Sequence, residues 1–506
     1  MNIYDLFLIS PGLSVIIIGF AALIVDLVTK NKNLMVFGIL VLLLIPLGLS
    51  ALQLQMINTG SILDVSNSSG LLEHKYNVDV FSVSLQMLIV FAVAITVMIS
   101  ANYLTDQFKT KGEYYTLMLF SAAGMMTLVS ASELILLYVG LELTGLPIAL
   151  LLALTLTKSA TSGALKFLVV SALSSAIMLY GMAFLFGFTG TTIIPEMSKS
   201  ILSQGSIATL DNNTILLVAV SLIVIGIGFK LSAVPFHMWV PDVYQSGPPP
   251  IVGFLSVASK AAAFALFLRI IYQIFGDIYV NWPLLIAIIA AASMIIGNIM
   301  AMVQTNIKRM LGFSTIAHAG YLLTGVAAIA VIQADKTFGL GIDGGSSVLF
   351  YLATYALANL TIFAGITLAG NRMIGDEISD YKSMIRKSPQ VAIMMSFALI
   401  ALIGIPPTGI FISKFYIFSA AMDSGLTWLV VIGVINSVVS AYYYVRLIKV
   451  MFQSEEDDPE DNKLDTPILT LAAMYITTIG TIWLGISPSS YISILEKGIS
   501  LLSGVN

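Results

Sequence analysis

Long apolar runs recur along almost the whole chain, and they constrain its fold more than any other feature. A helix needs about 20 apolar residues to cross the roughly 30 Å of hydrocarbon in a bilayer, and in lipid only helices or closed barrels satisfy every backbone hydrogen bond. The sequence predicts about fourteen transmembrane helices, approximately at 6–28, 34–55, 78–101, 113–130, 132–154, 162–188, 214–244, 249–274, 283–304, 309–332, 346–369, 390–421, 426–452 and 466–487.

Composition agrees with a membrane protein and narrows its chemistry. The 506 residues are 58% hydrophobic and 10% charged, whereas soluble domains are about 25% charged. The chain has no cysteine, which excludes disulfides, thiolate metal sites and iron–sulfur ligation. Its three histidines are too scattered to favour a haem or zinc site. If the chain serves a redox enzyme, we expect the electrons to travel through other subunits.

Basic residues gather in alternate loops. Short cytoplasmic loops of membrane proteins are enriched in Lys and Arg, and the loops on one side of the predicted bundle hold fourteen basic residues against four on the other. The richer side is predicted to be cytoplasmic, so both termini are expected outside. The first apolar run follows no basic residue and is too long for a signal-peptide core, so we expect it to remain as a transmembrane helix.

Two predicted helices carry prolines in mid-span. Pro235 follows Lys230 in the seventh helix, and Pro406-Pro407 precede Lys414 in the twelfth. A proline removes a backbone donor and clashes with the preceding turn, so both helices should break there. The seventh and twelfth helices cross in opposite directions, which is typical of inverted repeats with sites near the midplane. We predict an all-α membrane protein with two inverted five-helix repeats, helices 4–8 and 9–13.

The repeats divide a single polytopic membrane domain, 1–506, into four parts. We expect three additional helices in 1–111, one half-channel in 112–275, a second, inverted half-channel in 276–453, and a last helix with an interfacial tail in 454–506. Apolar residues at helical spacing predict that the tail is an amphipathic helix lying in the membrane interface: Ile492, Leu495, Ile499 and Leu502.

Ionisable residues deep in the membrane are the strongest functional signal. At 1.5 Å per residue, Glu142 and Lys260 lie about 15 Å from the nearest helix end, too deep to reach water. Each such charge costs about 2.5–3.5 kcal/mol on insertion scales, and burial favours the neutral form of both residue types. Lysines that alternate between charged and neutral forms, biased by a carboxylate, can pass protons. The candidates for such a relay are Glu142, Lys166, Lys230, Lys260, His318 and Lys414.

Each candidate also has a structural interpretation. The deep lysines and the glutamate are consistent with static buried ion pairs that fix helix packing. Lys166 is close enough to its helix start for its ammonium to extend to the cytoplasmic interface. His318 titrates near neutrality, but it is also consistent with a hydrogen-bonded packing residue. His237, which follows the first break, is consistent with either a helix cap or a relay member.

Three segments together form a recognisable pattern. They are Gly-Phe-Lys-Leu-Ser-Ala-Val-Pro-Phe-His-Met-Trp-Val-Pro-Asp-Val-Tyr at 228–244, Asn-Ile-Lys-Arg-Met-Leu-Gly-Phe-Ser-Thr-Ile-Ala-His-Ala-Gly-Tyr at 306–321, and Gly-Leu-Glu-Leu at 140–143. The chain resembles, over nearly its whole length, the antiporter-like membrane subunits of proton-pumping NADH:quinone oxidoreductase, respiratory complex I. Pro-Pro-Thr-Gly-Ile-Phe-Ile-Ser-Lys at 406–414 is most similar to the subunit N branch, because the related subunit M typically has a glutamate in place of this lysine.

This resemblance implies a proton relay and a role for each candidate. It implies that Glu142 and Lys166 form a charge pair at the mouth of a half-channel, that Lys230 is its central protonatable group, that Lys260 links it inward, that His318 holds a polar position in helix ten, and that Lys414 ends the relay.

The resemblance also implies what surrounds the chain. It implies a non-redox subunit of the translocase, with no NADH, flavin, iron–sulfur or quinone site and no bound metal; those cofactors would be on other subunits. Its partners would be the adjacent antiporter-like subunit and the small membrane subunits that lead to the quinone site, with no nucleic acid. Its location would be the bacterial plasma (inner) membrane.

Three functions are consistent with these features. The first is a proton-translocating subunit driven by quinone reduction elsewhere in the complex. The second is a subunit of a multi-subunit sodium/proton antiporter, which shares the fold and much of the charged row. The third is a scaffold whose buried charges only fix helix packing. The segment around Lys414 favours the first function over the second.

Overall fold

The computed structural model is an all-α bundle, as the sequence predicts. It describes residues 3–29, 32–59, 75–104, 111–203, 214–275, 282–329, 343–370, 375–453 and 466–503.

Its helices, in chain order, include two π-helical turns, η2 and η3, and one 3₁₀ turn, η4. They are α1 (Ile3–Val28), α2 (Lys32–Leu42), α3 (Leu44–Asn58), α5 (Val80–Ser100), α6 (Lys111–Ser130), α7 (Leu134–Ala153), α8 (Lys158–Thr189), α9 (Ile194–Ser203), α10 (Thr214–Leu231), α11 (Trp239–Ser246), α12 (Pro249–Phe254), η2 (Leu255–Ser259), α13 (Lys260–Ile270), η3 (Ile271–Phe275), α14 (Trp282–Met302), α15 (Ile307–Ile329), α16 (Gly344–Gly370), η4 (Ile378–Tyr381), α17 (Met384–Lys387), α18 (Pro389–Ile403), α19 (Gly409–Asp423), α20 (Thr427–Phe452), α21 (Ile468–Ile486) and α22 (Ser489–Ser503).

Membrane-length helices dominate the described residues. Eleven spans are long and apolar enough to cross a membrane. The other predicted spans correspond to α6, to α10 with α11, and to α18 with α19, where each helix pair is separated by a break. The chain is therefore a multi-pass membrane protein, while the count of fourteen crossings, the five-helix repeats and the four-part division stay predictions.

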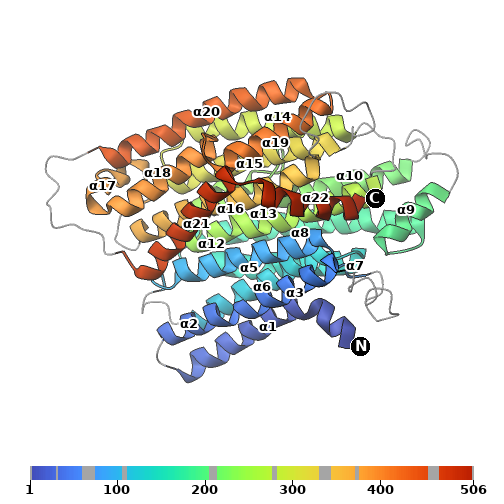
Figure 1. The fold of residues 1–506 in the computed structure, drawn as a ribbon, viewed down its shortest axis with the longest axis horizontal. Helices are drawn as coiled ribbons and strands as arrows, with labels where there is room; N and C mark the ends of the chain where they lie inside the picture. Colours follow the sequence, from blue (N-terminus) through green and yellow to red (C-terminus); the bar gives the residue numbers. More distant parts are fainter. Residues whose placement is uncertain are drawn as a thin grey trace.

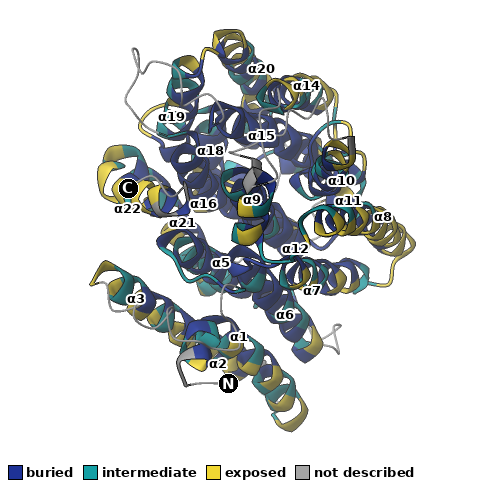
Figure 2. Cartoon of the chain, turned by 90° about the vertical axis from the view of Figure 1, so that its right-hand side faces the viewer, coloured by how far each residue is buried: buried dark blue, intermediate teal, exposed yellow. Residues whose placement is uncertain are grey.

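The core of the bundle is formed by helices from both halves of the chain (Figure 2). The most apolar windows of α15 and α16 are 100% and 94% buried, whereas those of α1 and α21 are each 33% buried. The central helices nevertheless carry histidine, tyrosine, serine, threonine and asparagine side chains. Polar groups therefore concentrate where protein, and not lipid, surrounds them, which is the arrangement that a membrane interior tolerates.

The ends of the helices sort into two opposite sides of the bundle (Figure 1). α1 begins and α22 ends on the side where α9 lies, and α17 lies on the other side. Because α9 precedes α10 and α17 precedes α18, the two interrupted passes run in opposite directions, as an inverted repeat requires. Which side faces the cytoplasm stays a prediction.

Small residues let neighbouring helices approach closely. A Cβ at Gly297 in α14 would lie 2.6 Å from the backbone nitrogen of Ala317 and 2.9 Å from the backbone oxygen of Phe313, both in α15. Transmembrane helices use glycine where their backbones come this close. No side chain fits at Gly297 unless α14 and α15 move apart.

We expect Gly297→Val to reduce the amount of assembled protein in the membrane strongly, as measured on native gels. Overpacking alone costs about 1–3 kcal/mol, and here the obstructing atoms are backbone. Gly187→Val in α8 is the matched control, because a Cβ at Gly187 meets nothing within 4 Å. Equal assembly of the two variants would show that the close approach is not required.

Candidate functional site

The first break places Lys230 at the end of a half-helix. α10 ends at Leu231, Ser232 takes a left-handed φ of 63°, and α11 begins only at Trp239. Pro235 lies inside this non-helical segment, and the peptide bond before it is cis. Lys230 therefore lies in the last turn of α10, where the exposed carbonyl ends of the helix favour a cation.

Lys230 is held by neutral groups and lies near one carboxylate. Its Nζ donates to Ser171 Oγ at 2.8 Å, and Gly145 leaves room for the ammonium, because a Cβ there would lie 3.2 Å from Nζ. Glu142 lies one turn before Gly145 on the same helix, α7. Glu142 Oε1 is buried and has no hydrogen-bond partner among the described atoms.

Lys166 does not pair with Glu142 in this structure. Its Nζ lies 2.6 Å from Asp242 Oδ2 in α11, and Arg309 Nη1 of α15 lies 2.7 Å from Asp242 Oδ1. α8 begins at Lys158, so Lys166 lies about two turns inside the helix, but its side chain is 54% exposed on this chain. The charge pair implied by the resemblance is replaced here by a bridge from Lys166 to Arg309 through one carboxylate.

Lys260 lies at the centre of the bundle. It directly follows the π-helical turn η2, a feature that is frequent at functional sites. Lys260 is 3% exposed, and its Nζ donates to the carbonyl of Thr315 at 2.7 Å. The ammonium also lies 5.5 Å from the ring centroid of Tyr355, a distance at which an aromatic face attracts a cation.

Polar and aromatic side chains lie between Lys260 and His318. Thr315 Oγ1 and the hydroxyl of Tyr355 are 2.9 Å apart, and the rings of Tyr355 and His318 are 5.0 Å apart. His318 is 2% exposed; its Nδ1 lies 2.6 Å from the hydroxyl of Tyr351, and its Nε2 lies 3.2 Å from that of Tyr444. Both ring nitrogens thus have partners that can donate or accept a proton.

The second break holds Lys414 against the end of another half-helix. α18 ends at Ile403 and α19 begins at Gly409, with Pro406 and Pro407 between them; the peptide bond joining these prolines is cis. Lys414 is 5% exposed, and its Nζ donates to the carbonyls of Ile403 at 2.9 Å and Leu402 at 3.3 Å. The ammonium of Lys414, a residue of α19, therefore lies at the C-terminus of α18. Lys230 is itself part of the last turn of α10.

Tyr321 connects His318 with Lys414. The Tyr321 ring lies 5.7 Å from the ring of His318 and 4.5 Å from the Lys414 ammonium. Ser437 joins the same group, because its hydroxyl lies 3.2 Å from Lys414 Nζ and 3.3 Å from the hydroxyl of Tyr321. The structure therefore joins Lys260, His318 and Lys414 through a run of short polar and aromatic contacts.

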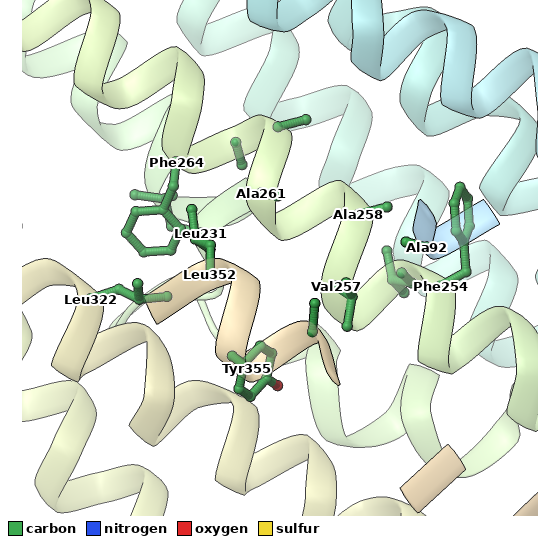
Figure 3. Packing of buried hydrophobic residues seen from close by; sticks show 14 of the residues in the cluster. Ala92, Leu231, Phe254, Val257, Ala258, Ala261, Phe264, Leu322, Leu352 and Tyr355 are labelled. Atoms are coloured by element: carbon green, nitrogen blue, oxygen red, sulfur yellow. The ribbon is translucent and has the colours of Figure 1, made fainter. Parts of the chain in front are cut away.

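Lys230 and Lys260 belong to separate hydrogen-bonded groups. No hydrogen bond in the described part of the chain joins these two lysines, whose donors go to Ser171 and Thr315. Figure 3 shows Leu231, the residue after Lys230, in the buried apolar packing with Phe264 and Leu352. The candidate site thus has two polar compartments, one around Lys230 and one from Lys260 to Lys414.

Several site residues were not singled out by sequence reasoning. Arg309 is one of the fourteen basic residues that the sequence assigns to the predicted cytoplasmic loops, and tyrosines on apolar helices cannot be distinguished from packing residues by sequence. The spacing of Thr315, His318 and Tyr321 on one helix face was a usable signal, because residues three apart on a helix lie side by side. Among the residues that the structure describes, no group of three His, Asp or Glu side chains is placed to hold a metal ion.

Comparison with known proteins identifies the family. The family model described as NADH:quinone oxidoreductase/Mrp antiporter, transmembrane, matches residues 131–440. The chain is 38% identical to NADH-quinone oxidoreductase subunit N of Desulforamulus reducens over 494 residues, which are 96% of each protein. It is 34% identical to subunit N of Dehalococcoides mccartyi over 502 residues, which are 98% of this chain and 99% of the relative.

Solved structures agree with this similarity. A chain of respiratory complex I from Thermus thermophilus with bound aureothin is 27% identical, with a TM-score of 0.77, over 96% of this chain and 100% of that one. A chain of the Mrp complex from Dietzia shares the fold, with a TM-score of 0.80 at 18% identity over 99% of this chain and 98% of that one. The family resemblance read from the sequence is confirmed, and the chain belongs to the subunit N family of NADH-quinone oxidoreductase, the antiporter-like membrane subunits of respiratory complex I.

Proposed function

We propose that this chain carries protons along the row from Glu142 through Lys230, Lys260 and His318 to Lys414, as a subunit of NADH:quinone oxidoreductase. The observation that carries this proposal is the absence of ion pairs along the row. Within the described residues, none of the three lysines has a carboxylate oxygen within 4.0 Å. Each lysine instead donates to neutral oxygens.

This pattern argues against a purely structural role. A buried charge that only fixes packing needs a paired counter-charge, because an unpaired one is costly. A lysine surrounded by neutral acceptors can also exist as the neutral amine, so it can give up a proton and take one back. Partners that both donate and accept, such as tyrosine, threonine and histidine, suit this exchange.

The polar compartment from Lys260 to Lys414 supplies short proton transfers. Neutral Lys260 accepts a proton at Nζ. Because the Lys260 ammonium donates to the Thr315 carbonyl, we infer that a water carries the released proton to the hydroxyl groups of Thr315 and Tyr355, which contact one another. His318 has a free lone pair on one ring nitrogen when neutral, so it can accept a proton between its tyrosine partners. Lys414, at the C-terminus of α18, is favoured as an ammonium by the helix dipole.

The compartment around Lys230 supplies the first acceptor. An ionised carboxylate near Lys230 favours the charged form of the lysine, so we expect a change in the charge around Glu142 to shift the proton affinity of Lys230. Lys166 pairs with Asp242, and its side chain is exposed on this chain. We therefore infer that Lys166 acts at the entrance of the proton path without contacting Glu142 directly. Lys230 and Lys260 share no hydrogen bond among the described residues, so transfer between them requires water or side-chain motion.

We propose that the redox chemistry lies on other subunits. The relatives are named NADH-quinone oxidoreductases, and this chain has no cysteine to hold an iron–sulfur cluster. Its partners would be the adjacent antiporter-like subunit and the small membrane subunits that connect it to the quinone site. The relatives are bacterial, which supports a location in the bacterial cell membrane with both termini outside.

Purification through a tag on this chain tests the complex to which it belongs. We expect the preparation to contain flavin and iron–sulfur proteins, to oxidise NADH with quinone, and to acidify proteoliposomes at a rate that is unchanged when potassium replaces sodium. The similarity of the fold to a chain of the Mrp complex supports the alternative function, a subunit of a sodium/proton antiporter. A preparation without NADH oxidation, in which proton movement requires sodium, would contradict the proposal and identify a sodium/proton antiporter subunit.

A further inference from the structure

A polar cavity of about 230 Å³ opens beside the first turns of α8. α8 and α11 line it, with Ser162, Gly163 and Lys166 on one wall and Asp242 and Ser246 on the other. The ion pair of Lys166 with Asp242 is part of this lining. A cavity with these polar walls holds water readily, and it lies at the end of α8 that is predicted to be cytoplasmic.

The inner face of α8 leads from this cavity to Lys230. Gly163, Phe167 and Ser171 follow one another at intervals of four residues, so they lie on one helix face about 6 Å apart along the axis. Gly163 is packed against Ser246 at the cavity, and Ser171 accepts the hydrogen bond from Lys230. Phe167 therefore stands between the cavity and the lysine.

Phe167 belongs to a cluster of three aromatic rings at the first break. Its ring centroid is 5.2 Å from that of Trp239 and 6.2 Å from that of Phe229, and the rings of Phe229 and Trp239 are 5.0 Å apart. The three residues are 3%, 1% and 6% exposed, in the order Phe167, Phe229 and Trp239. The Lys230 ammonium lies 6.0 Å from the centroid of Phe167 and 5.5 Å from that of Phe229.

The cluster also spans the break in the helix. Phe229 is in the last turn of α10, and Trp239 is the first residue of α11. Trp239 Nε1 donates to the carbonyl of Phe229 at 3.3 Å, which ties the two sides of the break together. The cluster therefore connects the two helices that flank the non-helical segment 232–238.

We propose that Phe167, Phe229 and Trp239 form a gate that closes the polar cavity from Lys230, and that movement of the break opens it. This inference rests on the proposed function, because such a gate has a purpose only if Lys230 takes up protons. Apolar constrictions in membrane proteins block ions by excluding water. When the rings separate, water joins the cavity to Lys230, and the neutral amine accepts a proton from it.

The test uses the intact complex in proteoliposomes. Phe167→Ser should raise the passive proton leak several-fold, measured without NADH as the decay of an imposed pH gradient, because it opens a polar route through the ring cluster. Phe184→Ser is the matched control on the same helix: Phe184 also contacts a ring, that of Tyr180 at 4.8 Å, but it lies outside the cluster. An unchanged leak in Phe167→Ser, or an equal leak in Phe184→Ser, would overturn the gate.

A second variant separates the gate from the relay. The leak of Phe167→Ser should disappear in Phe167→Ser/Lys230→Met, because the path beyond the gate passes through Lys230. A leak that persists in the double variant would show that the rings guard some other route. The proposed function is tested separately by Lys230→Met alone. Normal proton pumping in that variant would contradict the relay, whatever leak Phe167→Ser shows.

Cysteine labelling gives a readout that does not depend on the stability of Phe167→Ser. This chain contains no cysteine, so a single introduced thiol can be followed by peptide mass spectrometry after treatment with a membrane-impermeant maleimide. Ser162→Cys, in the cavity, should react quickly at rest. Ser171→Cys, behind the rings, should react slowly at rest and several-fold faster during NADH oxidation; equal rates in the two conditions would overturn the opening of the gate.

Discussion

Replacing Lys230 by alanine should leave the complex assembled but slow its proton uptake about tenfold. The variant removes the acceptor next to Glu142, and a barrier raised by about 1.4 kcal/mol already slows a transfer tenfold. Assembly should survive because Lys230 makes one side-chain hydrogen bond, to Ser171, and forms no ion pair within 4.0 Å among the described residues. The measurement is the initial rate of dye quenching in NADH-energised vesicles, normalised to the amount of complex.

Lys199→Ala provides the control for Lys230→Ala. Lys199 lies in the short helix α9 and is exposed, so its loss changes the charge of the chain equally but leaves the row intact. Pumping should match the parent protein in this variant. If assembled Lys230→Ala complexes pump at the same rate as Lys199→Ala complexes, Lys230 is not part of the path.

At Lys260, one substitution that removes the charge and one that keeps it permanently should have the same result. Lys260→Met keeps much of the side-chain volume without a charge, and Lys260→Arg keeps a charge that does not leave, because a guanidinium is not deprotonated in proteins. A relay needs the proton to come and go at this position, so we expect proton uptake to fall about tenfold in both variants. Vesicle assays and native gels on the same membranes would measure uptake and assembly.

The pair of variants distinguishes a relay from a fixed charge. If Lys260 acted only as a permanent cation on Tyr355 and the Thr315 carbonyl, Lys260→Arg would pump and Lys260→Met would not. Thr315→Val is a useful companion, because it keeps the carbonyl that Lys260 contacts and removes only the hydroxyl that contacts Tyr355. We expect its pumping to lie between those of the parent and Lys260→Met.

Features that depend on local chemistry were predictable from the sequence. A proline inside a helix removes a hydrogen bond and crowds the preceding turn, which predicts the breaks around Pro235 and Pro406-Pro407, and α10 and α18 end close to these prolines. Proline alone does not fix a break, however, because α7 runs through Pro147 as a continuous helix. Helical rise predicted a position for Lys260 far from both helix ends, and its side chain is buried, while its depth in the membrane stays a prediction. The all-helical fold followed from hydropathy, because lipid leaves a chain few alternatives.

Features that depend on how helices are turned toward one another were not predictable. Lys166 and Asp242 are 76 positions apart, and nothing in either segment says that α8 presents this lysine to α11 and not to α7. The contacts of His318 with Tyr351 and Tyr444 join three helices. From the sequence alone, these tyrosines are equally consistent with core packing or with a position at the membrane interface.

Leu231 places a hydrocarbon side chain directly after Lys230 and lies in apolar packing with Phe264 and Leu352. In such low-dielectric surroundings two charges act on one another more strongly than they do in water. If protons pass along the proposed row, a charge added at Lys230 therefore lowers the affinity of Lys260 for its own proton before any proton moves between the two lysines.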